Sequence, residues 1–371
     1  MSKVKLGEVA IEHKETCKGN KDGYPIVGLE HLVPEEVTLT AWDEGSDNTF
    51  TKMFRKGNVL FGRRRAYLKK AAVAPFDGIC SGDITVIEAI PDRILPMLLP
   101  FIIQNDELFD FAVGKSAGSL SPRVKWEHLK NYEFELPDMD KQRELAELLW
   151  AMDATKKSYH KLIAATDELV KSQFIEMFGN PMTNDKHWPT KKMKDVAPSS
   201  PYTGEIIQNT NGYWLLNLDM VESNSGRIIE KVYVAEDEIG QSTTTFSSKY
   251  VLYSKLRPYL NKVVVPDDDG YATTELIPLL PNQQLLTQLY LAQLLRGDEF
   301  LAYISSQVSG TKMPRVTMNV FWDFDVMLPP LYLQERYAAF VRQSDKSKFE
   351  LEQALSELTA TYKRIIAENL G

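Results

Sequence analysis

Two kinds of hydrophobic pattern follow each other along the chain, and their order occurs twice. Short apolar runs typical of β-strands are found at 59–62, 71–75, 84–89, 251–254, 262–266 and 276–280. Longer apolar-rich stretches of helical length follow at 95–112 and 285–304. Each half of the chain therefore predicts a mixed domain, and the expected class is α+β, with two tandem globular domains.

A long amphipathic segment closes each half. After Pro137 and again after Pro330, apolar residues recur at helical spacing, charged residues fill the other faces, and no glycine interrupts the first segment before Gly179. We expect helices over 138–180 and 330–371, each roughly 50 Å long at about 1.5 Å per residue.

These helices could pack on their own domains, or pair with each other as an antiparallel coiled coil. The narrow apolar stripe favours the pair. Its members, expected to bind a partner helix or subunit, are Leu145, Leu149, Met152, Leu162, Phe174, Leu351, Leu355, Leu358 and Ile365.

The second half repeats the first at an offset of about 192 positions. VLFGRRRAYLKKAAV at 59–73 matches VLYSKLRPYLNKVVV at 251–265, and AGSLSPRV at 117–124 matches SGTKMPRV at 309–316. FELPDMDKQRE and VMLPPLYLQER, before the two long helices, keep the same offset. We therefore expect domains at 1–137 and 181–329, each followed by its long helix.

Composition limits the classes of protein. The chain has 371 residues, is 43% hydrophobic and carries a formal net charge of −8. It has no run of eighteen apolar residues and no signal-like start, and Cys17 and Cys80 are not spaced as metal ligands. We expect a protein of the reducing cytoplasm with no bound metal. Local basic surfaces remain effective, because charges are screened beyond roughly 10 Å at about 0.1 M salt.

Basic residues cluster in the repeated loop and in the repeated glycine turn. Arginine and lysine there could neutralise phosphates or contact guanine edges, and tyrosine could pack on sugar or base. The alternative is a solvated basic face with Tyr67 and Tyr259 in the core. The candidate DNA-binding residues are Arg63, Arg64, Arg65, Tyr67, Lys69, Lys70, Ser119, Arg123, Lys255, Arg257, Tyr259, Lys262, Thr311, Lys312 and Arg315.

Catalytic signatures are missing from the sequence. It has no glycine-rich phosphate loop, no Asn-Pro-Pro-aromatic or Asp-Pro-Pro-Tyr motif and no nuclease core of paired carboxylates with lysine. Asp83 and Glu275 occupy matching positions, but carboxylates in separate domains are poor candidates for an acid/base pair. We therefore expect no catalytic residues in this chain.

The duplicated domain, each copy followed by Leu-Pro, a glutamine and a long helix, resembles the specificity subunit of type I restriction–modification systems. The residues that carry the resemblance are LYSKLRPYLNKVVV, GYATTELIPLLP, SGTKMPRV and LPPLYLQER in the second half, with LFGRRRAYLKK, CSGDITVIE, GSLSPRV and LPDMDKQRE in the first. The first copy departs from the second with Gly-Arg-Arg-Arg-Ala in place of Ser-Lys-Leu-Arg-Pro, a difference that bears on base specificity.

The resemblance implies that each domain reads one half of a split DNA target, while the helix pair sets the gap and docks two methyltransferase subunits. S-adenosylmethionine, and ATP with Mg²⁺ where restriction subunits join, would bind those partners, and this chain would hold no cofactor. A different class, a structural adaptor with two binding domains on a coiled-coil rod and no role on DNA, is the alternative.

Overall fold

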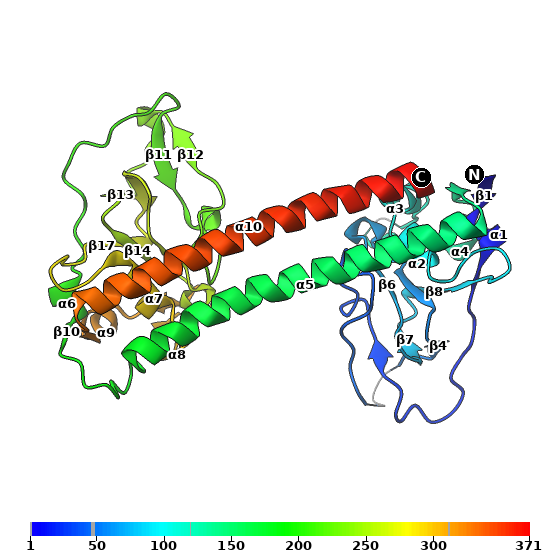
Figure 1. Cartoon of the computed structure of the whole chain (residues 1–371), viewed down its shortest axis with the longest axis horizontal. Coiled ribbons are helices and arrows are strands. Elements are labelled where there is room, and N and C mark those ends of the chain that lie inside the picture. Colours follow the sequence, from blue (N-terminus) through cyan, green and yellow to red (C-terminus); the bar gives the residue numbers. More distant parts are fainter. Residues whose placement is uncertain (1, 46–48, 119, 311) are drawn as a thin grey trace. The chain divides into compact units, whose positions relative to one another are not determined.

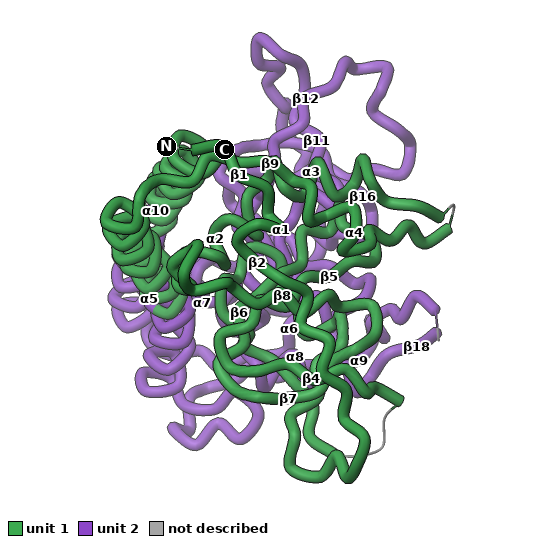
Figure 2. Tube along the Cα trace, turned by 90° about the vertical axis from the view of Figure 1, so that its right-hand side faces the viewer, with its two compact units in different colours: residues 1–161, 351–371 green, residues 162–350 purple. Residues whose placement is uncertain are grey.

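The computed structural model describes residues 2–45, 49–118, 120–310 and 312–371. It divides the chain into two compact units, residues 1–161 with 351–371 and residues 162–350 (Figure 2). We call them unit 1 and unit 2 and describe each by itself. Among the described residues, no helix is both long and apolar enough to cross a membrane.

Unit 1 is a mixed unit of short strands and helices (Figure 1). Its elements are β1 (Ser2–Lys5), α1 (Leu6–Val9), β2 (Ala10–Glu12), β3 (Ile26–Val27), β4 (Lys52–Phe54), β5 (Val59–Gly62), η1 (Ala66–Leu68), β6 (Ala71–Val73), β7 (Gly78–Cys80), β8 (Ile84–Ala89), α2 (Leu99–Ile103), α3 (Asp106–Gly114), α4 (Trp126–Leu129), β9 (Glu133–Leu136) and parts of α5 (Met139–Phe178) and α10 (Leu331–Leu370). The strands form sheets in the orders β2-β8-β5-β6, β3-β7-β4 and β1-β9.

Unit 2 repeats most of this order and has additional elements. Its elements, beside the remaining parts of α5 and α10, are β10 (Thr190–Lys192), α6 (Met193–Val196), β11 (Tyr213–Leu216), η2 (Leu218–Met220), β12 (Val232–Val234), η3 (Glu236–Glu238), β13 (Thr243–Phe246), β14 (Val251–Ser254), η4 (Pro258–Leu260), β15 (Val263–Val264), β16 (Gly270–Thr273), β17 (Leu276–Leu279), α7 (Gln288–Arg296), α8 (Asp298–Ser305), β18 (Val308–Ser309), β19 (Arg315–Val316), α9 (Met318–Trp322) and β20 (Asp325–Met327). The additional elements lie between β11 and β13 and after α8. The sheets are β12-β11-β16-β13, β15-β14-β17, β10-β20 and β18-β19.

The central strand of each unit, β5 or β14, is buried on both faces. Val59 and Phe61 point into one core while Leu60 points into another, because successive side chains of a strand alternate. Val251, Leu252 and Tyr253 are divided between two cores in the same way. Burial on both faces explains why these strands read as continuous apolar runs.

A buried glutamine joins each long helix to its unit. The side chain of Gln142 accepts from the Leu95 N–H at 2.8 Å and donates to the Pro137 carbonyl at 2.9 Å. Gln334 accepts from the Thr287 N–H and donates to the carbonyls of Leu285 and Pro329, at 2.8–2.9 Å. The glutamine after each Leu-Pro thus satisfies backbone groups that would otherwise be buried without partners.

Halves of α5 and α10 pack together within each unit, running in opposite directions. In unit 1, Tyr362 and Ile366 of α10 share a core with Leu149 of α5. In unit 2, the Tyr337 hydroxyl donates to the Val170 carbonyl at 3.0 Å, and Lys348 pairs with Asp167 at 2.7 Å.

The expected class and the two long helices are therefore confirmed. Each helix has 40 residues, or about 60 Å, somewhat longer than expected. The helical stretch at 95–112 is two helices rather than one, since Asn105 caps α3 through its side chain.

Candidate nucleic-acid interface

The basic loop of each unit is a short 3₁₀ turn held between two left-handed residues. In unit 1 these are Arg65 (φ 55°) and Lys69 (φ 51°), and in unit 2 Arg257 (φ 50°) and Asn261 (φ 48°). The tyrosine of each turn lies at its outer face, and the alternative interpretation that placed these tyrosines in the core is wrong. Tyr67 is 55% exposed and Tyr259 is 54% exposed.

The repeated glycine turn is hydrogen-bonded to the basic loop. In unit 1 the Arg65 N–H donates to the Pro122 carbonyl at 2.9 Å, and the Val124 N–H donates to the Arg63 carbonyl at 3.0 Å. The same two bonds recur in unit 2, from Arg257 to Pro314 at 2.7 Å and from Val316 to Lys255 at 2.9 Å. Loop and turn thus form one surface in each unit, which we call the basic surface.

Glycine is required where each turn reverses. Gly118 has φ +116° and Gly310 has φ +89°, conformations that L side chains rarely adopt. A Cβ would also come within 3.3 Å of a backbone carbonyl three residues later in both turns. The glycine of the repeated motif therefore serves the turn itself.

A carboxylate behind each basic surface holds the arginine of the turn. Arg123 makes two bonds to Asp83, at 2.7 and 3.3 Å, and Arg315 makes two bonds to Glu275, at 2.9 and 3.4 Å. The hydrogen bond from Arg123 lowers the pKa of Asp83 below its usual value, and the positive charges of Arg64 and Arg63 lower that pKa further. These carboxylates hold the guanidinium groups of the two turns in place.

The two lysines shared by the loops are tied into the fold. The Lys70 ammonium donates to the Leu29 carbonyl at 2.7 Å, and the Lys262 ammonium donates to the Leu218 carbonyl at 2.6 Å. Lys69 pairs instead with Asp106 at 2.5 Å. A residue that recurs in both copies can therefore stabilise the loop instead of binding DNA.

The other candidate side chains differ in their exposure and in their hydrogen bonds. The Arg64 Nε donates to the Ser121 hydroxyl at 2.5 Å, and its guanidinium approaches Asp83 at 3.5 Å. Arg65 and Lys312 are exposed and Lys255 is half-buried. The Nε atoms of Arg63 and Arg257 are buried without a hydrogen-bond partner in the described part of the chain. Ser119 and Thr311 lie outside the described residues.

The helix residues expected to bind a partner pack mainly inside this chain. Leu145, Leu149, Met152 and Phe174 are buried in the cores of their units. The half-buried residues are Leu351, Leu355, Leu358 and Ile365. Leu162 is 51% exposed. Most of the apolar stripe therefore joins α5 and α10 to each other and to their units.

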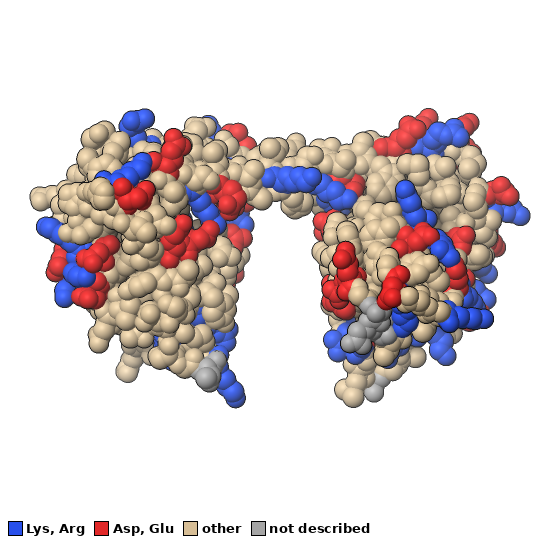
Figure 3. Space-filling model, turned by 90° about the horizontal axis from the view of Figure 1, so that it is seen from below, with Lys and Arg blue, Asp and Glu red and all other residues tan. Residues whose placement is uncertain are grey.

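Charges are mixed over most of the surface. On the face that Figure 3 shows, Lys and Arg are interspersed with Asp and Glu in both units. This mixture agrees with the formal net charge of −8, and it means that the basic surfaces are local features.

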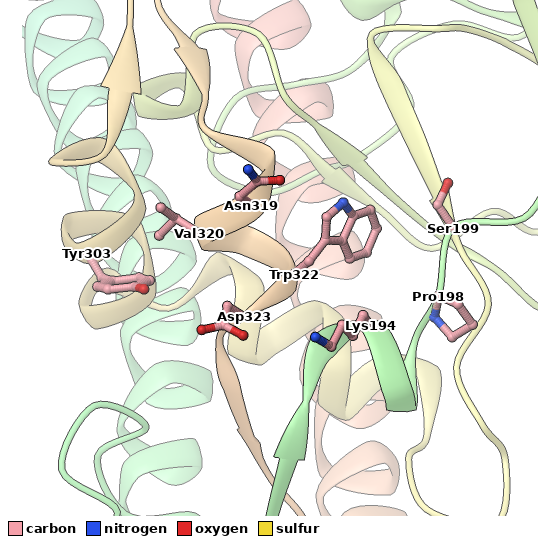
Figure 4. A pocket seen from close by; sticks show the side chains of 8 residues that line it. All are labelled: Lys194, Pro198, Ser199, Tyr303, Asn319, Val320, Trp322 and Asp323. Carbon is pink, nitrogen blue, oxygen red and sulfur yellow. The ribbon is translucent and has the colours of Figure 1, made fainter.

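Unit 2 also has an open groove of about 930 Å³ (Figure 4). Its lining includes Lys194, Tyr303, Trp322 and Asp323, and none of its lining residues belongs to the basic surface. The residue at the position of Lys194 in unit 1 is Gly7, whose Cα is covered by the Lys130 side chain. The two copies differ at this position, and we assign the groove no role in the repeated site.

One group of side chains in the described part of unit 1 could be mistaken for a metal site. Glu30, His31 and Asp43 place their oxygen and nitrogen atoms within 4.8 Å of one another. The Nδ1 of His31, however, accepts the Gly28 N–H at 2.9 Å, so the neutral ring carries its proton on Nε2, which faces Asp43 at 3.5 Å. Neither nitrogen then has a free lone pair for a cation, and we assign no metal here.

The chain is built from two tandem α+β units. Each unit has one basic surface that carries arginines, and each contains one part of α5 and one part of α10. This arrangement defines a duplicated recognition protein. The chain belongs to the family of type I restriction modification DNA specificity domains, whose model matches residues 1–165 and 185–359. The match covers most of both units and includes both basic surfaces.

Individual relatives agree with this family. The type I restriction enzyme EcoDI specificity subunit of Escherichia coli is 25% identical over 152 residues, which are 40% of this chain and 34% of that protein. The matched region thus spans about a third of that relative's length.

Two solved structures share the fold. A chain from a study of complex assembly and conformational transition of the type I R-M system is 20% identical, with a TM-score of 0.57, covering 99% of this chain and 97% of that one. The type I restriction-modification S subunit from M. genitalium is 12% identical, with a TM-score of 0.58, covering 98% and 94%.

Sequence reasoning missed the carboxylate clamps and the exposed apolar tips of the glycine turns. Asp83 precedes Arg123 by the same distance as Glu275 precedes Arg315, and this equal spacing was the available signal. The exposure of Leu120 (92%) and Met313 (50%) had no signal in the sequence, because burial depends on what the fold places beside a residue.

Proposed function

We propose that this chain is the DNA specificity subunit of a type I restriction–modification complex, in which each unit reads one half of a split target. The observation that carries the proposal is the repeated basic surface. Each unit presents an exposed tyrosine beside arginines whose backbone and carboxylate partners fix their positions. Two such surfaces in one chain suit two contacts on one duplex.

The chemistry of the basic surface fits a polyanion with stacked bases inside it. Phosphate contacts position a protein on DNA, while contacts in the grooves select the sequence. Arg65 in unit 1 and Lys312 in unit 2 are exposed and can supply such phosphate contacts.

We further propose that α5 docks the methyltransferase subunits. Outside the stripe that joins the two helices, α5 carries a second row of uncharged residues, spaced alternately three and four apart and all exposed. These are Leu148, Ala151, Thr155 and Ser158 in unit 1, and Leu162, Ala165, Leu169 and Ser172 in unit 2. Such spacing is that of a coiled-coil seam, which a helix of a partner could cover.

On this account the chain is not itself an enzyme and works in the cytoplasm. Methyl transfer from S-adenosylmethionine belongs to the partner subunits, and ATP-driven translocation with Mg²⁺ belongs to restriction subunits that join them. The chain's own part is to hold two recognition surfaces and a docking helix. The missing catalytic motifs of the sequence agree with this division of labour.

Methylation mapping tests the proposal. A host that expresses candidate methyltransferase subunits is sequenced for modified adenines, with and without the chain. We expect a split motif, two short blocks separated by a fixed gap, to be methylated only when the chain is present. If no split motif depends on the chain, the proposed function is wrong.

A further inference from the structure

The tip of each glycine turn carries an exposed apolar side chain whose role the basic surface alone does not explain. We propose that Leu120 in unit 1 and Met313 in unit 2 contact base edges in a DNA groove and determine the sequence that each unit prefers. The inference rests on the proposed function and adds to it the residues that read the bases.

Both apolar side chains are exposed. Leu120 is 92% exposed, more than any other large hydrophobic residue in the described part of the chain, and Met313 is 50% exposed. A single exposed leucine needs no explanation by itself. Both of these residues, however, lie in glycine turns that are bonded to the basic loops.

The described residues at the base of each turn are hydrogen-bonded. In unit 1, Ala117 and Arg123 exchange backbone hydrogen bonds at 3.0 and 2.9 Å, and Ser121, next to the tip, accepts from Arg64. In unit 2, β18 and β19 pair Ser309 with Arg315 below the tip. Because the base of each turn is already hydrogen-bonded, less ordering is required when its exposed apolar side chain enters a groove.

The two tips do not occupy the same position of the repeat. Leu120 corresponds to Lys312, and Met313 corresponds to Ser121. Residues that hold the turn, such as Gly118 and Gly310, do recur at the same position. A requirement of the fold would place the apolar residue identically in both copies. The difference is what two units that read different sequences require.

Base pairs present apolar groups that an aliphatic side chain can contact. An aliphatic side chain can contact the methyl group of thymine in the major groove or enter between base pairs from the minor groove. The carboxylate-held Arg123 and Arg315 stand beside the tips and can bind phosphates, which would set the depth of entry. Phosphate contacts and base contacts then come from neighbouring residues of one turn.

A binding selection tests the inference. The full chain, assembled with its methyltransferase subunits, selects from a pool of randomised duplexes, and the selected sequences give the preference at each position. We expect Leu120→Ser to lower discrimination about tenfold at one or two adjacent positions of one block and to leave the other block unchanged. Met313→Ser should do the reverse. Neither change removes a charge, so the dependence of affinity on salt should be unaltered.

Two controls accompany the pair. Leu120→Met keeps an apolar tip and should retain most of the discrimination. Met97→Ser removes an apolar side chain about as exposed as that of Met313 (52% against 50%). The Met97 carbonyl contacts α5, and this variant should change neither block.

Several results would overturn the inference. Unchanged preferences in both serine variants would show that the tips do not read bases. Equal weakening of both blocks would indicate a structural effect, and loss of the methyltransferase subunits from Leu120→Ser would show that the tip binds protein instead. If the unaltered complex selects no split sequence at all, the proposed function itself fails.

Discussion

The two basic surfaces share their backbone and differ in the side chains that they present. In both units the loop is bonded to the glycine turn in the same way, and a lysine of the loop donates to a carbonyl elsewhere in the unit. Yet Arg64 in unit 1 corresponds to Leu256 in unit 2, and Lys69 corresponds to Asn261.

The comparison shows which kind of repetition is informative. Some residues that recur at the same offset hold the basic loop to the rest of its unit, and we call these contacts the frame. Lys70 and Lys262 are examples, although their charge alone suggests that they bind phosphates. Of the residues that change between the copies, Leu120 and Met313 are exposed, while Arg64 is half-buried and donates to Ser121 of the turn. In a duplicated recognition protein, the differences between the copies are therefore the better guide to specificity.

The largest loss in the free energy of unfolding is expected for changes at the glutamines that join the long helices to their units. Gln142→Leu and Gln334→Leu each leave backbone groups buried without partners, at about 1–3 kcal/mol per group. Gln334 serves three groups and Gln142 serves two, so the free energy of unfolding should fall more for Gln334→Leu. Chemical denaturation measures both. Gln343→Leu, at an exposed position of α10, is the matched control, and an equal loss in it would contradict the assignment.

The next largest loss of stability is expected for the two lysines that hold the loops, Lys70 and Lys262. Lys70→Met and Lys262→Met each remove one hydrogen bond to a backbone carbonyl, at a cost of about 1 kcal/mol in the free energy of unfolding. If these lysines serve the frame, the slope of log affinity for duplex DNA against log salt should not change. A slope lowered by about 0.9 per lysine would show that they bind phosphates after all.

Exchange of the differing residue alters binding rather than folding. Arg64→Leu gives unit 1 the residue of unit 2, and Leu256→Arg does the reverse. We expect the salt slope of duplex binding to fall by about 0.9 in the first variant and to rise by a similar amount in the second. Fluorescence titration at several salt concentrations measures both slopes. Two unchanged slopes would remove Arg64 from the DNA surface.

The smallest effect concerns the Asp83 clamp. Because Arg123 lowers the pKa of Asp83 in the folded chain, the stability that the pair adds is present above the ordinary carboxylate pKa and is lost as pH falls through the lowered one. Asp83→Asn should lower the Tm by about 2 °C near neutral pH, and the difference should vanish in acid. A difference that persists in acid would mean that the charge of Asp83 is not what matters.

The sequence predicted the class of fold because its signals are long and periodic. The apolar runs of β5 and β14 and the 40-residue amphipathic helices are strong patterns, and the duplication doubled each of them. The arrangement of the site was less predictable, because its partners are distant in the chain. Asp83 and Arg123 are 40 residues apart, and Lys70 lies 41 residues from the carbonyl that it contacts. No local pattern distinguishes a lysine of that kind from one that faces solvent.

We propose that one chain holds two separate DNA-reading surfaces. Hydroxyl-radical footprinting of the chain with its methyltransferase subunits, on a duplex that carries the methylated motif, distinguishes two surfaces from one. We predict two protected blocks, with Arg64→Leu weakening the protection of one block only. A single protected block, or equal weakening of both blocks by a change in unit 1 alone, would contradict the account.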